Sequence, residues 1–253
     1  MYIKYILVII LYLFYLNLKM SEKKEKTIKV LFIGNSHTYM NDMPSLFSHI
    51  YEKTTGYKVD SVMLAYSARS LGWHLKEYLS LRYNILYGKY DYCIIQQRAH
   101  PFPSEEETLR DGKKIIEICK KVNTRVVLFM TWAEKAHPEN QQKMIDTYEK
   151  LAIETYSILA PIGIIWEKIL KKYPEIELYY KDGAHASPYG DLLISAVLVK
   201  AISGINPSFP DYILDNKIEF REAGIDIEEN IDNIKIKFDE NICKKIYNCI
   251  IEN

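Results

Sequence analysis

Two short segments, far apart in the chain, carry side chains that could act together. An apolar run at 28–33 ends in the sequence GNSHT at 34–38, which contains Ser36. Far downstream, Asp182 and His185 stand three residues apart. On a turn, that spacing lets the carboxylate reach Nδ1 of the imidazole while Nε2 points away. A neutral histidine oriented in this way can take the proton from a serine hydroxyl, which makes the serine a nucleophile.

Other interpretations of the segment around Ser36 fit less well. A phosphate-binding loop needs several glycines or a Gly-Lys-Ser/Thr sequence, and this segment has one glycine and no lysine. The nucleophile elbow of α/β-hydrolases needs a glycine where Thr38 stands and several strands before it, and nothing sheet-like precedes Ile28. Taken alone, Ser36 could cap a helix and Asp182 could be a turn residue. Their combination with His185 favours the nucleophile.

The elements that must position these residues alternate between short apolar runs and amphipathic segments. We expect strands at 28–33, 59–64, 92–95, 126–130 and 162–165, and helices at 44–51, 71–81, 105–121, 141–159, 166–172 and 192–202. Alternation of this kind predicts a three-layer α/β/α sandwich with about five parallel strands, flavodoxin-like. Ser36 and His185 would then both lie in loops at the carboxyl side of the sheet, where ligands bind in such folds.

Composition limits the partners. Lys and Arg total 33 and Asp and Glu total 33, so no excess of positive charge supports nucleic-acid binding. The four cysteines show no zinc-ligand spacing, and neither a metal nor an organic cofactor is implied. We predict three parts: a hydrophobic signal or anchor segment with a polar spacer at 1–26, the catalytic domain at 27–206, and a mainly helical C-terminal appendage at 207–253.

The apolar stretch at 5–18 follows Lys4 and is shorter than a full membrane span. Three interpretations stay open. The stretch is an export signal with a poor cleavage site, an uncleaved anchor that leaves the domain outside the cytoplasm, or the result of a misassigned start, with Met20 as the first residue. Hydropathy favours the first two, so we expect an extracytoplasmic protein that is secreted or attached to the membrane.

The two chemical segments together resemble motifs of the SGNH (GDSL) hydrolase superfamily. The sequence GNSH at 34–37 is similar to its first motif, and Asp182-x-x-His185 is similar to its last. A branch of bacterial hydrolases of unknown activity shares further segments: LFIGNS at 31–36, ARSLGWHL at 68–75, IIQ at 94–96, and TW at 131–132. The resemblance covers roughly residues 28–207. Its motifs are specific as a pair and weak singly.

The resemblance implies a catalytic triad of Ser36, His185 and Asp182. It also implies an oxyanion hole made by the backbone N–H groups of Ser36 and Ala68 and by the Gln96 amide. Two departures matter here, because the family has a glycine near Ala68 and an asparagine where this strand ends in glutamine. Without these donors the protein would be a poor enzyme despite its triad.

Several other residues receive weaker predictions. His37, Ser67, Gln97 and Trp132 are candidates for a substrate pocket, although a buried aromatic is the safer interpretation of Trp132. Gln96 and Gln97 could equally be an ordinary strand end. His100 precedes a proline in a loop and is expected to be exposed to solvent.

The expected function is therefore hydrolysis of a carboxylic ester, with a short acyl group, such as acetyl, on a carbohydrate as the substrate. The substrate would be a small-molecule or carbohydrate ester. Two alternatives remain: a catalytically degenerate protein that binds a glycan or acyl ligand, and an acyltransferase that excludes water from the same triad.

Overall fold

The protein is built around one parallel β-sheet. The computed structural model describes residues 26–209, 214–216, 234–236 and 238–252. The five strands lie in the order β2-β1-β3-β4-β5, and every neighbouring pair is parallel. Their bounds are β1 Thr27–Gly34, β2 Lys58–Ala65, β3 Tyr92–Ile95, β4 Arg125–Phe129 and β5 Ile158–Ala160. The predicted α/β fold class and the five parallel strands are confirmed.

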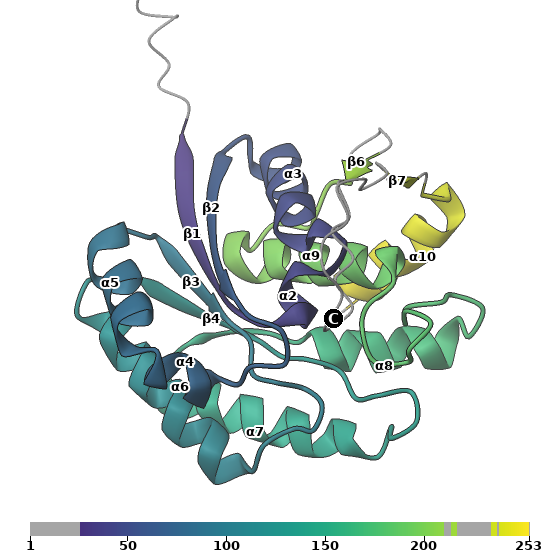
Figure 1. The fold of residues 1–253 in the computed structure, drawn as a ribbon. Helices are drawn as coiled ribbons and strands as arrows, with labels where there is room; N and C mark the ends of the chain where they lie inside the picture. Colours follow the sequence, from purple (N-terminus) through teal and green to yellow (C-terminus); the bar gives the residue numbers. More distant parts are fainter. Residues whose placement is uncertain (1–25, 210–213, 217–233, 237, 253) are drawn as a thin grey trace, which may run out of the picture.

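Helices cover both faces of this sheet (Figure 1). One layer holds α3 (Met43–Thr55), α8 (Ile162–Lys172), α9 (Pro188–Ser203) and α10 (Glu240–Ile251), and the other holds α4 (Leu71–Lys76), α5 (Tyr78–Gly88), α6 (Glu105–Lys120) and α7 (Asn140–Thr155). Side chains of β1 alternate between two cores, because successive residues of a strand point to opposite faces. Val30 and Phe32 pack in the first core, and Leu31 and Ile33 in the second.

The fifth strand lies earlier in the chain than the sequence predicted. The prediction of a strand at 162–165 is wrong, because these residues begin α8 and β5 occupies Ile158–Ala160. Pro161 stands at the junction as the N-cap of α8. One side of α8 is buried, so its first turn is as apolar as a buried strand. In so short an apolar run, the spacing of the residues does not distinguish a helix from a strand.

Two further helices differ from the prediction. The helix expected at 141–159 ends at Thr155, where Tyr156 takes a left-handed backbone conformation with φ 56°. The helix expected at 71–81 is divided at Glu77 into α4 and α5. Within α4, His74 lies next to Gly34 at the carboxyl end of β1.

The C-terminal part packs on the domain through α10, which covers the helix expected near 242–251. Ile246, Cys249 and Ile250 bury one side of α10 in the core that also contains α8 and α9. Two short antiparallel strands, β6 (Leu214–Asn216) and β7 (Ile234–Ile236), precede it and were not predicted.

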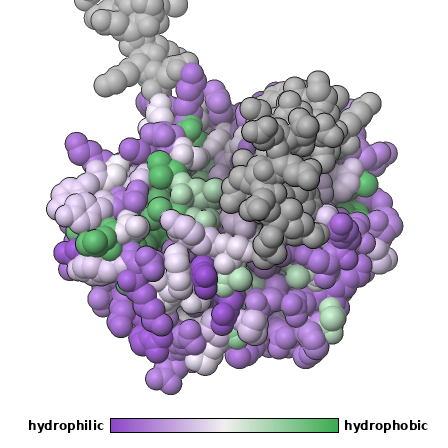
Figure 2. Space-filling model, in the orientation of Figure 1, coloured by the Kyte–Doolittle hydropathy of each residue, from purple (hydrophilic) through white to green (hydrophobic). Residues whose placement is uncertain are grey.

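The predicted hydrophobic segment at 5–18 lies outside the described residues. Of the helices that are described, none is both long enough and apolar enough to span a membrane. Figure 2 shows a largely hydrophilic face, with hydrophobic residues visible mainly on the side where α5 and the first strands lie.

Candidate active site

The loop after β1 places Ser36 at the start of a short helix, α2 (Ser36–Tyr39). Asn35 is the N-cap, and its Oδ1 accepts a hydrogen bond from the His37 amide at 3.0 Å. Gly34 allows the strand to approach its neighbours closely. A Cβ at that position would lie 2.3 Å from Thr38 Oγ1 and 2.5 Å from Gln96 Oε1. A larger residue would therefore have to displace the side chains of Thr38 and Gln96.

The three predicted catalytic side chains form one hydrogen-bonded chain. Ser36 Oγ lies 2.8 Å from His185 Nε2. His185 Nδ1 lies 2.6 Å from Asp182 Oδ2. The second carboxylate oxygen, Oδ1, accepts hydrogen bonds from the amides of Ala184 at 2.9 Å and of His185 at 3.0 Å. This geometry holds the imidazole with Nδ1 toward the carboxylate and Nε2 toward the serine, as the spacing predicted.

The environment of Asp182 favours its ionised form. Partial burial pushes the pKa of this carboxyl up, but the hydrogen bond from His185 and those from the two amides outweigh burial, so the pKa is lowered. Asp182 is therefore a carboxylate at neutral pH. It can stabilise a positive charge on His185 when the imidazole takes a proton.

Trp132 supports the loop that carries Asp182 and His185. Its Nε1 donates a hydrogen bond to the Ala184 carbonyl at 2.9 Å, and its ring stacks on Trp166 with centroids 4.2 Å apart and planes 4° apart. Trp132 has no exposed surface, so it lies beneath the site and does not line an open pocket. The buried position of Trp132 agrees with its interpretation as a core aromatic rather than a pocket residue.

The rings of His37 and His100 form a cluster with that of His185. The ring of His37 is 4.8 Å from that of His185 and 5.0 Å from that of His100. Burial, followed by the neighbouring His185 and His100, lowers the pKa of His37 well below its usual value. Burial and then His185 lower the pKa of His100 to about 4. Both rings are therefore neutral at pH 7, and His37 is too buried, at 5% exposure, to line a pocket.

The expectation that His100 is exposed to solvent is wrong. Its side chain is 13% exposed, because the loop after β3 turns it inward toward His37. Nδ1 of His100 lies 3.6 Å from a carboxylate oxygen of Glu134. Among the described residues, no three His, Cys, Asp or Glu side chains are grouped so that they could hold a metal ion.

The two backbone amides predicted to bind an oxyanion belong to Ser36 and Ala68. Within the described part of the chain, neither the Ser36 amide nor the Ala68 amide has a hydrogen-bond partner. Ala68 takes φ 58°, in the left-handed region that glycine favours. The backbone therefore keeps the conformation of a glycine where the related motif has one. Ser67 and Ala68 are both exposed, so a substrate could reach this position.

The Gln96 side chain is used inside the protein. Its Oε1 accepts hydrogen bonds from the Asn35 amide at 2.9 Å and from Thr38 Oγ1 at 3.1 Å. Its amide group donates to the Gln97 carbonyl, and the residue is 1% exposed. In this arrangement Gln96 offers no N–H to a substrate, in contrast to the oxyanion role expected of it. It ties the loop of Ser36 to the end of β3.

Gln97 is also buried, and it supports a different loop. Its Oε1 accepts hydrogen bonds from the Leu71 amide at 3.0 Å and the Arg98 amide at 2.9 Å. With no exposed surface, it does not line an open pocket. Of the four residues predicted for a pocket, only Ser67 is exposed.

His74 is a buried residue of α4 that contacts the end of β1. Its Nε2 lies 2.8 Å from the Gly34 carbonyl, so α4 is joined to the end of β1 directly beside Ser36. Burial lowers the pKa of His74, although the Gly34 carbonyl acts in the opposite direction. The segment at 68–75 contains this histidine, but its spacing does not say that the ring would reach β1.

Solved structures that resemble this protein share its fold. No family model matches the sequence, and no curated protein matches it. A protein from Slackia heliotrinireducens, described as a putative SGNH hydrolase, superposes with a TM-score of 0.60 at 21% identity, over 70% of this chain and 100% of its own. A DUF4886 family protein from Bacteroides uniformis gives a TM-score of 0.63 at 15% identity, over 90% of this chain and 94% of its own.

A catalytic mutant of Axe2, an acetylxylan esterase from Geobacillus stearothermophilus, also superposes, with a TM-score of 0.54 at 16% identity. The match covers 71% of this chain and 96% of that one. Identities this low are evidence for a shared architecture. The chain therefore has the fold of the SGNH hydrolases, as its first and last motifs indicated.

Proposed function

We propose that the protein is a serine esterase that hydrolyses carboxylic esters, with short acyl groups on a carbohydrate as its substrates. One observation carries the proposal. Ser36 Oγ lies 2.8 Å from His185 Nε2, and the same imidazole is oriented by Asp182. A serine at this distance from a neutral imidazole can lose its proton as it attacks a carbonyl carbon.

The proposed reaction has two halves. In the first, Ser36 Oγ attacks the ester carbonyl, its proton passes to His185 Nε2, and the protonated imidazole then gives that proton to the departing alkoxide. In the second, His185 takes a proton from water, the hydroxide attacks the acyl-serine, and the proton returns to Ser36 as the acid leaves. Asp182 stabilises the imidazolium in both halves.

The oxyanion would be bound by the backbone amides of Ser36 and Ala68. Each donor of this kind lowers an acyl-transfer barrier by about 3 to 4 kcal/mol. Gln96 is left out of the proposed oxyanion hole, because one N–H of its amide group is bonded to the Gln97 carbonyl and the residue is only 1% exposed. This leaves two backbone donors and no side-chain donor.

The missing side-chain donor also favours the second candidate function, a protein that binds an acyl or glycan ligand without turnover. In that case Ser36 would not react with a covalent serine probe. The carbohydrate substrate is supported by analogy with the acetylxylan esterase. An acyltransferase would be revealed by a new ester product when a sugar acceptor is added.

The test combines turnover with covalent labelling. A protein beginning near Thr27 is assayed with acetyl, butyryl and octanoyl para-nitrophenyl esters and labelled with a fluorophosphonate. We expect hydrolysis and labelling in the parent protein, and loss of both in Ser36→Ala and His185→Ala. The matched controls are Ser80→Ala and His49→Ala, which change exposed residues of α5 and α3 and should retain activity. Labelling that survives in Ser36→Ala would refute the assignment.

We also propose that the protein works outside the cytoplasm, on the basis of the apolar stretch at 5–18. Fractionation of cells that express the full chain or a chain starting at Met20 tests this. We expect only the full chain in the membrane or medium. Equal distribution of the two forms would contradict the proposal.

A further inference from the structure

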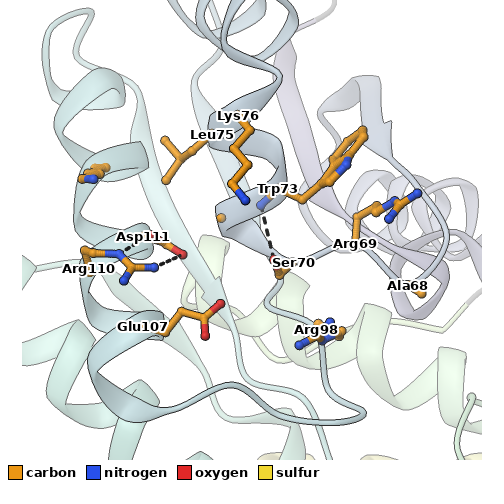
Figure 3. Close-up of a pocket in the computed structure, with 12 residues that line it drawn as sticks. Ala68, Arg69, Ser70, Trp73, Leu75, Lys76, Arg98, Glu107, Arg110 and Asp111 are labelled. Carbon is orange, nitrogen blue, oxygen red and sulfur yellow. Dashed lines mark hydrogen bonds and ion pairs between the residues drawn. The ribbon is translucent and has the colours of Figure 1, made fainter.

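A cleft of about 490 Å³ begins at Ala68 and runs between α4 and α6 (Figure 3). It is lined by five basic side chains and two acidic ones. The basic residues are Arg69, Lys76, Arg98, Arg110 and Lys114, and the acidic residues are Glu107 and Asp111. In a chain with equal numbers of basic and acidic residues, this is a local excess of positive charge.

Most of that positive charge is not neutralised by ion pairs. Asp111 is paired with Arg110, with contacts of 2.8 and 3.1 Å. In the described part of the chain, Arg69, Lys76 and Lys114 have no acidic partner, and Arg98 donates from Nε to the Pro101 carbonyl. Glu107 is the remaining acid of the lining.

The basic side chains come from three separate segments. In Figure 3, Lys76 extends from α4 toward the middle of the cleft, Arg98 lies on the opposite wall, and Arg69 lies beside Ala68. Gly72 lets α4 approach α6 closely, because a Cβ there would lie 2.4 Å from a carboxylate oxygen of Asp111. Cations that converge from different elements can surround one anionic group, which two cations on one helix face cannot do.

The cleft is continuous with the proposed oxyanion site. Ala68 belongs to both sites, because its amide is a proposed oxyanion donor and the residue also lines the cleft. Arg69 is the next residue, and its carbonyl accepts a hydrogen bond from Asn35 Nδ2 at 3.0 Å. A molecule whose carbonyl group is bound at the Ala68 amide would therefore lie next to residues of the cleft.

We propose that this cleft binds a carboxylate carried by the ester substrate, so that the enzyme prefers anionic esters to neutral ones. The proposal rests on the proposed esterase function and adds the substrate class. The carboxylate could belong to the acyl part, as in a half-ester of a dicarboxylic acid, or to the alcohol part, as in an acylated acidic sugar. Arginine matches a carboxylate with two parallel hydrogen bonds, and a basic cleft also attracts anions before contact.

Two matched pairs of substrates separate these sources. For the acyl part, mono(para-nitrophenyl) adipate is compared with para-nitrophenyl hexanoate, which has the same chain length. For the alcohol part, para-acetoxybenzoate is compared with its methyl ester. We expect kcat/KM for the anionic member of one pair to exceed that of the neutral member by about tenfold, since a charge-assisted hydrogen bond contributes that much. The preference should shrink in high salt, because salt screens exposed charges.

The variants test whether the cleft causes the preference. Lys76→Gln and Arg98→Gln should each lower the anionic-to-neutral ratio of kcat/KM, and the double variant should lower it further than either change alone. Lys120→Gln is the matched control, because it removes an exposed lysine of α6 that does not line the cleft. That control should keep the parent ratio.

The outcomes distinguish the two proposals. Hydrolysis of neutral esters with no anionic preference in either pair, or a preference unchanged in the double variant, overturns the cleft assignment and leaves the esterase standing. If no ester is hydrolysed, binding of adipate and glucuronate is measured by calorimetry instead. If the parent protein binds one of these anions and the double variant does not, the cleft assignment is supported and the esterase function is refuted. If neither anion binds the parent protein, both proposals are refuted.

Discussion

His100 should make the protein less stable in mild acid. Its pKa is about 4 in the folded protein, against 6.5 for an ordinary histidine, because burial and the nearby His185 oppose its charge. Below pH 6.5 the unfolded chain therefore binds a proton that the folded chain does not, so the free energy of unfolding falls as pH falls from 6.5 to 4. From these two pKa values, the loss between pH 7 and pH 5 is about 2 kcal/mol. His37, whose pKa is lowered too, acts in the same direction.

The assay is urea unfolding at pH 7 and pH 5 for the parent and for His100→Gln. The variant has no charge to gain at this position, so its loss of stability on acidification should be smaller by about 2 kcal/mol. Phe102→Leu is the control. It changes the packing of the same loop, where Phe102 contacts Tyr148 with ring centroids 6.1 Å apart, but adds or removes no titrating group. It should lower stability equally at both pH values.

A pH dependence in His100→Gln equal to that of the parent would refute this reasoning. It would mean that the His100 ring is hydrated or relaxes on protonation, so that burial does not oppose the charge. A variant that is merely less stable at both pH values would still support the prediction, since the measured quantity is the difference between the two.

Three further predictions concern the site. Ala68→Gly should raise the free energy of unfolding by about 1 kcal/mol in thermal or urea unfolding, because Ala68 holds a left-handed φ that glycine adopts freely, and esterase activity should remain. Trp132→Phe removes the hydrogen bond to the Ala184 carbonyl, so steady-state kinetics should show kcat lowered about tenfold with little change in KM. An unchanged kcat would mean that other contacts hold the loop of Asp182 and His185. Gly34→Ala should cost roughly 1 to 3 kcal/mol in urea unfolding and abolish serine labelling, because its Cβ would overlap Gln96 Oε1; normal labelling would show that the loop can adjust.

Most of the fold could be predicted because parallel strands buried on both faces are continuous apolar runs. Tyr92–Ile95 is such a run, and its bounds agree with the prediction. The prediction was wrong at 158–165, where a three-residue strand and the first turn of a buried helix are equally apolar on either side of Pro161. Only packing against the sheet distinguishes the two, and packing is a tertiary property.

The site could be predicted as far as local spacing determines it. Asp182 and His185 lie on one turn, so their contact follows from the sequence, and topology brings Ser36 to the same edge. The Gln96 amide could point toward solvent or back toward Asn35, and the choice depends on neighbours from β1. The basic cleft was missed for the same reason, because its cations are scattered over three segments.

The contact between Ser36 and His185 joins residues 149 positions apart. Nearly the whole domain must therefore be synthesised and folded before Ser36 and His185 come into contact. An emerging or truncated chain carries the serine without this contact, as an ordinary alcohol. Appearance of a probe-reactive serine would therefore report that the two ends of the domain have come together, a non-local contact of the kind that slows folding.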